Sequence, residues 1–125
     1  MKITIVGSMK FYDEFVKAKE YLEERGHYVI LPRKDPMPEP IPKDFKLKAM
    51  QKFNENLAKA DAILVMNYTK DDKENHIGVN SLMEIGMAFN REKKIFVLNK
   101  MPESCLHELE AINCVVLNGK LDSLD

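Results

Sequence analysis

The sequence has little of what marks membrane, secreted or nucleic-acid-binding proteins. Its 125 residues include 19 basic and 20 acidic side chains, with a formal net charge of −1 and no long basic stripe. Charge therefore gives no reason to expect a nucleic-acid partner. No apolar run approaches the roughly 18 residues that span a bilayer, and the N-terminal segment lacks a signal-peptide cleavage site. We expect a cytoplasmic protein with no membrane contact.

Cysteine and histidine are scarce and lack the spacing of ligands. The two cysteines, Cys105 and Cys114, fall in a helical pattern and a strand-like run. They indicate reduced thiols, and a structural disulfide is not expected. The three histidines are scattered along the chain, so a zinc site is not expected.

Glycine-rich phosphate-binding motifs are absent. The chain has no G-x-G-x-x-G and no G-x-x-x-x-G-K-[ST], which argues against a dinucleotide site and a P-loop. Gly7 and Ser8 follow the first apolar run. Such a turn can offer backbone N–H groups and a hydroxyl to a phosphate, or it can simply connect a strand to a helix.

Short apolar runs alternate with helical patterns along the chain. Each run is rich in β-branched residues and bounded by turn formers, which is typical of strands buried on both faces of a parallel sheet. The expected strands are residues 3–6, 28–31, 62–66, 95–98 and 114–117, and the expected helices are about 12–25, 44–59, 80–91 and 103–111.

This order predicts one α/β domain over residues 1–125. We expect a three-layer, doubly wound sandwich with a five-stranded, mostly parallel sheet of the Rossmann or flavodoxin-like kind. Residues 32–43 carry five of the six prolines and predict a stiff surface loop. Residues 67–78 are polar and lead from the third strand into the third helix.

Ligands of such sheets bind beyond the carboxyl ends of the strands. This rule selects the Gly7-Ser8 turn, the loops 32–43 and 67–78, and the start of the third helix. Glu84, near that start, is the one acid in the apolar segment 78–89.

Two interpretations of Glu84 are open. An acid near a helix N-terminus is favoured by the helix dipole, with Asn80 or Ser81 as the N-cap. Alternatively, Glu84 is a poorly solvated carboxylate, which suits a nucleophile. Gly86 removes a side chain beside it and would let a ligand or a backbone come close.

With these residues in hand, the chain resembles the nucleoside 2-deoxyribosyltransferase-like family, which includes the 2′-deoxynucleoside 5′-phosphate N-hydrolases. The resemblance runs through ITIVGSM at 3–9, LAKADAILVMNY at 57–68 and GVNSLMEIGMAFNREKKIFVLN at 78–99. The M-E-I-G-x-A stretch resembles the way in which the family presents its catalytic glutamate, and it falls on Glu84.

The resemblance implies cleavage or base exchange at the N-glycosidic bond of a small-molecule nucleoside or nucleoside 5′-monophosphate. Glu84 would be the nucleophile, in the manner of a retaining glycosidase, without metal or cofactor. It also implies a homodimer or higher homo-oligomer, in which a neighbouring subunit helps to close each site. The implied substrate-binding residues are Gly7, Ser8, Met9, Asn67, Gly78, Asn80 and Ser81.

The sequence departs from the family pattern at three places. Residues 4–6 lack the tyrosine of the first strand, Phe53 stands where a second acid is usual, and Gly78 stands where Asp or Ser is usual. Glu55 is a possible substitute for the second acid. The alternative function is therefore a non-catalytic nucleotide-binding or sensor module on the same fold. NAD glycohydrolysis is a third hypothesis, since related folds also use a glutamate on a helix.

Overall fold

Within residues 1–33 and 38–124, which the computed structural model describes, five strands form one sheet in the order β2-β1-β3-β4-β5. Every neighbouring pair is parallel, so the expected mostly parallel sheet is parallel throughout. The strands are β1 (Lys2–Val6), β2 (Tyr28–Ile30), β3 (Ala62–Val65), β4 (Lys94–Val97) and β5 (Val115–Val116).

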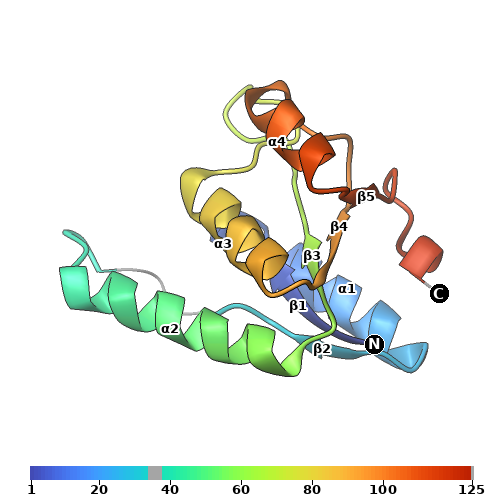
Figure 1. Ribbon diagram of the computed structural model, residues 1–125, viewed down its shortest axis with the longest axis horizontal. Coiled ribbons are helices and arrows are strands. Elements are labelled where there is room, and N and C mark those ends of the chain that lie inside the picture. The colour runs from blue at the N-terminus through green and yellow to red at the C-terminus, as the bar shows by residue number, and fades with distance from the viewer. Residues whose placement is uncertain (34–37, 125) are drawn as a thin grey trace.

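Helices connect the strands in the predicted order (Figure 1). They are the 3₁₀ turn η1 (Met9–Phe11), α1 (Tyr12–Glu24), α2 (Lys43–Lys59), α3 (Val79–Asn90), η2 (Glu103–Cys105), α4 (Leu106–Ala111) and η3 (Leu121–Leu124). The predicted α3 cap was wrong. Gly78, with extended backbone, is the N-cap, and its carbonyl accepts a hydrogen bond from the Leu82 N–H. The helix therefore begins before both Asn80 and Ser81.

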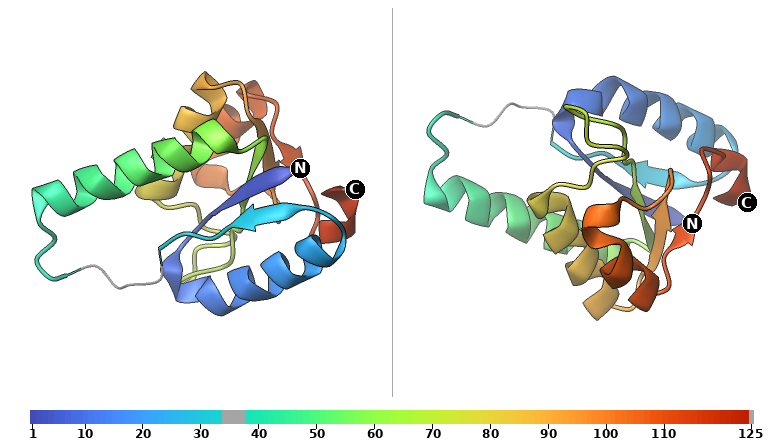
Figure 2. Two further views of the ribbon diagram at one scale, coloured as in Figure 1. Left: turned by 90° about the horizontal axis from the view of Figure 1, so that it is seen from below. Right: turned by 90° about the horizontal axis from the view of Figure 1, so that it is seen from above.

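The helices cover both faces of the sheet, as a doubly wound fold requires. Figure 2 shows α1 on one face and α2, α3 and α4 on the other. The α1 face buries Phe15 and Leu22 against β1 and β3, and the other face buries Leu57, Ile85 and Leu109. All four residues of β3 are buried, which is why this strand reads as a continuous apolar run.

Further expectations concerned the cysteines, the proline-rich loop and membrane-spanning segments. Cys105 and Cys114 are both free thiols, as expected. Residues 34–37 of the proline-rich loop lie outside the described residues, and the part at 38–42 is exposed. In the described part of the chain, no helix is both long and apolar enough to cross a membrane.

Candidate active site at the carboxyl edge of the sheet

Gly7 directly follows β1, at a point where a side chain would clash. A Cβ atom there would lie 2.9 Å from the Met66 carbonyl oxygen and 2.9 Å from Cζ of Phe15. Both distances are shorter than ordinary van der Waals contact. The glycine therefore has a packing reason, because it lets the end of β1 approach β3 and α1 closely. Met9, two residues on, is exposed at the start of η1.

Ser8, in the turn after β1, contacts a loop that lies far away in the sequence. Its Oγ accepts a hydrogen bond from the Lys10 backbone N–H at 3.4 Å, which caps η1. The same Oγ is 3.2 Å from Nζ of Lys70, which comes from the loop after β3. Sequence reasoning missed Lys70, because the charged run around it is typical of a solvated loop.

A tight turn holds Lys70 in place. The backbone groups of Lys70 and Lys73 exchange two hydrogen bonds of 3.0 Å. The residues between them, Asp71 and Asp72, have φ values of 49° and 64°. Two consecutive left-handed residues in a two-residue hairpin are typical of a type I′ turn. The turn fixes the backbone of Lys70, and the side chain contacts Ser8 instead of extending freely into solvent.

Asn67 points into the protein. Its Nδ2 donates to the carbonyls of Asn99 and Lys100 at 3.1 and 3.2 Å, and its Oδ1 accepts from the Asn99 N–H at 2.9 Å. Asn99 returns the contact by donating from Nδ2 to the Asn67 carbonyl at 2.8 Å. The side chain of Asn67 is 1% exposed. It thus joins the segments that follow β3 and β4 at the carboxyl edge of the sheet.

Tyr68, directly after Asn67, lies at the surface of the same edge. Its ring packs against Phe11 with centroids 5.0 Å apart. Burial, aided by the negative charge of Glu14, raises the pKa of Tyr68 above its ordinary value. The pair Phe11 and Tyr68 gives the Ser8 turn an aromatic flank.

Glu84 is half-buried on α3, with Ile85 and Ala88 of the same helix fully buried beside it. It is the sixth residue of a helix that begins at Val79, and the first turn contains no acid. The favourable effect of the helix dipole falls off within that first turn. The helix dipole therefore does not explain why an acid stands at position 84.

Burial raises the pKa of Glu84 to about 7, and the positive charge of Lys46 on α2 partly opposes this. Among residues 1–33 and 38–124, no second carboxylate contributes to this shift. Glu84 is thus a carboxyl group close to its titration point at neutral pH, with a lysine as its charged neighbour. A group of that kind is a candidate nucleophile or general acid–base.

The side chains of Arg91 and Asn54 connect α3 to α2. Nε of Arg91 donates to Oδ1 of Asn54 at 2.9 Å. Both helices run back from the carboxyl edge on the same face of the sheet, so they are parallel. Glu84 lies about two turns before Arg91, and Lys46 lies about two turns before Asn54. This register brings Lys46 and Glu84 to corresponding levels of the two helices.

No acid stands at the expected position, and Glu55, the expected substitute, points to solvent. Phe53 is 7% exposed and packs in the core with Leu57 and Ile85. Glu55 is largely exposed and lies 3.7 Å from Lys52, one turn away on the solvent side of α2. At the position where a second acid was expected, this chain therefore has a core residue, Phe53.

The other expected positions lie around the start of α3. Gly78 caps the helix, Asn80 is exposed and Ser81 is buried against the protein. A Cβ atom at Gly86 would meet nothing within 4 Å, so the side of α3 on which Gly86 lies is open in the described part of the chain.

Glu84 lines neither of two surface hollows that described residues form. The larger, about 490 Å³, lies at the amino edge of the sheet beside Lys2 and Tyr28, far from the strand ends that carry ligands in this fold. The other, about 350 Å³, lies between the loops after β3 and β4. Its lining residues are Lys73, Glu74, Asn75, His76, Lys100, Met101, Pro102, Glu103 and Ser104. In the described part of the chain, no group of three or more His, Cys, Asp or Glu side chains could hold a metal ion.

Solved structures share this architecture. A 2-deoxyribosyltransferase from Bacillus psychrosaccharolyticus superposes with a TM-score of 0.63 at 17% identity, over 86% of this chain and 81% of that one. A CMP N-glycosidase from Clostridium botulinum superposes with a TM-score of 0.62 at 15% identity, over 100% and 99% of the two chains. A conserved protein from Enterococcus faecalis gives 0.57 at 18% identity, over 90% and 74%.

No protein-family model matches the sequence, and no curated protein matches it. The likeness therefore establishes the fold. At that level it confirms the resemblance and the architecture inferred from the sequence.

Proposed function

We propose that this chain, which has the fold of a 2-deoxyribosyltransferase and of a CMP N-glycosidase, cleaves or exchanges the N-glycosidic bond of a nucleoside or nucleoside 5′-monophosphate. The observation that carries the proposal is Glu84. It is a half-buried carboxyl group on α3, near the carboxyl edge of the sheet, and neither a helix cap nor an ion pair with Arg91 accounts for it.

Glu84 would act as a nucleophile in its ionised form. One carboxylate oxygen forms a bond to C1′ of the sugar while the C1′–N bond breaks, and its electron pair leaves with the base. The transition state resembles an oxocarbenium ion, and the product is a glycosyl ester of Glu84. Water then attacks C1′ to give hydrolysis, or a second base attacks to give exchange. Either step returns Glu84 as a carboxylate.

The leaving base must gain a proton, and among residues 1–33 and 38–124 no second acid acts on Glu84. Lys46 is the charged side chain that acts on Glu84 across the helix pair. Its ammonium group could hydrogen-bond to the departing base and stabilise the negative charge that develops there. We therefore propose that Lys46, rather than a second carboxyl group on α2, assists the departure of the base.

A second copy of the chain is proposed to cover α3. Val79, Met83 and Gly86 recur at i, i+4 and i+7 along one side of this helix, and the two apolar side chains are 81% and 48% exposed. Figure 1 shows the first turns of α2 extending past the sheet, where Leu47 is also exposed. Exposed apolar side chains on two neighbouring helices are typical of an interface between subunits.

The oligomer has its own test. Sedimentation of the parent protein over a range of concentrations should give a dimer or a larger assembly, and Met83→Glu should shift it toward the monomer. Val115→Glu is the matched control, because Val115 is equally exposed but lies at the far edge of the sheet. A parent protein that is monomeric at every concentration contradicts the proposal.

The second candidate function is a nucleotide-binding or sensor module without turnover. The observation that favours it is Phe53, a core residue at the position where a second acid was expected. This function predicts that a nucleotide raises the melting temperature and is recovered unchanged.

One experiment separates the two functions. Deoxynucleosides, ribonucleosides, their 5′-monophosphates and NAD are incubated with the protein, alone and with an acceptor base, from about pH 5 to about pH 8. Release of free base, or formation of an exchanged nucleoside, supports the enzyme and excludes the sensor. Trapping of a glycosyl adduct on Glu84 supports the nucleophile. If no compound is consumed, the enzyme hypothesis is wrong.

A further inference from the structure

Strand β2 is an outermost strand of the sheet, next to β1. Its Tyr28 donates the backbone N–H to the Met1 carbonyl, directly before β1, at 3.0 Å. Successive residues of a strand direct their backbone polar groups to opposite sides, so the N–H and C=O of Val29 face away from the sheet. Outward groups on an edge strand are a template for pairing with another chain.

Two side chains of α1 bind these outward groups. The Val29 N–H donates to Oε2 of Glu23 at 3.3 Å, and the Val29 carbonyl accepts from Nζ of Lys19 at 2.8 Å. Nζ of Lys19 and Oε2 of Glu23 also lie 3.2 Å apart and form an ion pair. The pair thus supplies Val29 with the acceptor and the donor that a further strand would supply.

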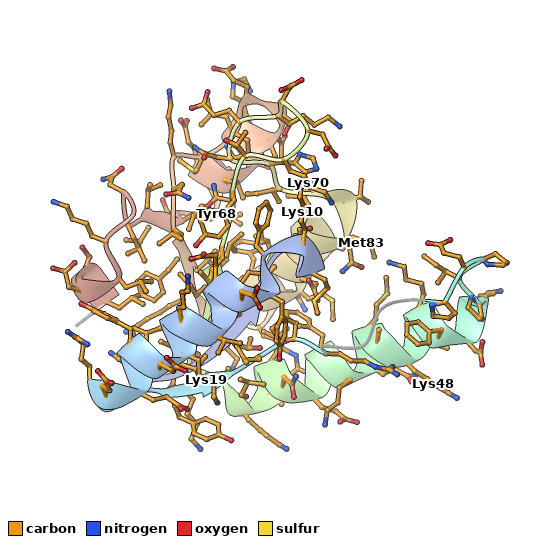
Figure 3. All side chains as sticks on the ribbon, turned by 180° about the vertical axis from the view of Figure 1, so that it is seen from behind. Lys10, Lys19, Lys48, Tyr68, Lys70 and Met83 are labelled. Atoms are coloured by element: carbon orange, nitrogen blue, oxygen red, sulfur yellow. The ribbon has the colours of Figure 1, made fainter. Side chains whose placement is uncertain are left out.

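Several contacts hold this ion pair against β2. Lys19 and Glu23 are four residues apart on α1, which brings their side chains together. Figure 3 shows Lys19 where α1 runs alongside β2, and its Nζ lies 5.8 Å from the centroid of the Tyr28 ring. The Val29 N–H, and after it the Lys19 ammonium group, lowers the pKa of Glu23. The carboxylate is therefore ionised at neutral pH, as the ion pair requires.

The segment around β2 is one that could pair between molecules. The run YVIL at 28–31 is uncharged and made of aromatic, β-branched and aliphatic residues, a composition typical of intermolecular strands. On its N-terminal side, the His27 N–H donates to the Leu22 carbonyl at the end of α1 at 3.1 Å. On its C-terminal side, Pro32 has no N–H to donate. The flanks of β2 therefore also limit pairing along this edge.

We propose that Lys19 and Glu23 protect the free edge of β2 from pairing with β2 of a second copy of the chain. Two such edges would meet across a twofold axis as antiparallel strands, and one sheet would continue into the next molecule. The inference does not depend on the proposed function. It concerns a surface other than the exposed side of α3, through which the proposed dimer forms.

The test replaces the ion pair by apolar side chains. In the double variant Lys19→Met with Glu23→Met, the Val29 amide should exchange its hydrogen about 10-fold faster than in the parent, because it loses a bond to a charged group. At equal concentration this variant should also form large assemblies that scatter light and show intermolecular β-sheet by infrared spectroscopy. Unchanged exchange at Val29, or faster exchange without assembly, overturns the inference.

The matched control is the double variant Glu14→Met with Lys17→Met. These residues form another ion pair of α1, 3.4 Å long, and in the described part of the chain no hydrogen bond joins them to β2. Each double variant keeps the net charge of the parent, so charge does not separate them. A control that assembles as readily as the first variant contradicts the inference.

A conservative variant separates hydrogen bonding from other effects of the substitutions. Lys19→Arg with Glu23→Gln keeps a donor and an acceptor at the two positions. It should stay dispersed like the parent, with slow exchange at Val29. Assembly of this variant to the same extent as the Met variant would show that the two hydrogen bonds to Val29 are not what protects the edge.

Discussion

Lys46 on α2 lowers the pKa of Glu84 on α3, but burial of Glu84 raises it further, to about 7. The two effects differ in origin, since one is a charge on a neighbouring helix and the other is the loss of water around the carboxylate. Their balance places the titration of Glu84 within the range where the protein can be assayed.

The first prediction concerns the pH dependence of cleavage. The proposed nucleophile, Glu84, acts in its ionised form, so kcat/KM should rise with pH through about 7 and level off above it. Glu84→Gln should lose about 10³-fold or more of the activity at every pH. The measurement is base release at fixed ionic strength. A profile that is flat from about pH 5 to about pH 8 would show that Glu84 is not the group that titrates.

The second prediction concerns stability. Folding raises the pKa of Glu84 above its ordinary 4.5, so the folded protein holds the proton more tightly than the unfolded chain does. The resulting stabilisation is complete below about pH 4.5 and is lost as the pH rises through about 7. Glu84→Gln removes this dependence. At about pH 8 it should exceed the parent in free energy of unfolding by up to about 3 kcal/mol.

Urea unfolding of both proteins at several pH values measures this difference. The gap between them should shrink on acidification and be smallest below about pH 4.5. A gap that does not change with pH would mean that Glu84 is well solvated in the folded protein.

The third prediction tests the influence of Lys46. Lys46→Met removes the positive charge that opposes burial, so the pKa of Glu84 should rise and the pH profile should move to higher pH. Lys48→Met is the control, because Lys48 is exposed on the same helix and contributes nothing to the pKa of Glu84. If both variants shift the profile equally, the effect belongs to the net charge of the protein rather than to Lys46.

The fourth prediction compares two glycines. Gly7→Ala places a Cβ against the Met66 carbonyl and the Phe15 ring and should destabilise the protein by about 1–3 kcal/mol. Gly86→Ala meets nothing and lies within α3, so it should stabilise the isolated chain by about 0.5–1 kcal/mol. Thermal unfolding checks both. A stable Gly86→Ala protein with impaired activity would indicate that a ligand or a second copy packs against the side of α3 that carries Val79, Met83 and Gly86.

The sequence by itself determined the architecture, and it led to the expectation of a site at the carboxyl edge of the sheet. Apolar runs such as 62–66 are local patterns, and a strand buried on both faces needs no distant information to be recognised. The same is true of α1 and α2, whose bounds fall within about one residue of the expected ones. Glu84 was found in this way too, because one acid among apolar neighbours is a local anomaly.

The tertiary structure decided which side chains meet. Ser8 and Lys70 are separated by 62 residues, and they touch because β1 and β3 are neighbours in the sheet, which no local periodicity encodes. Asn67 lies in the polar loop of the sequence, yet its side chain turns inward because Asn99 and Lys100, which follow β4, offer it three hydrogen bonds. Local periodicity shows which residues of a segment are buried. The order of the strands in the sheet decides which loops lie next to one another, and therefore which side chains meet.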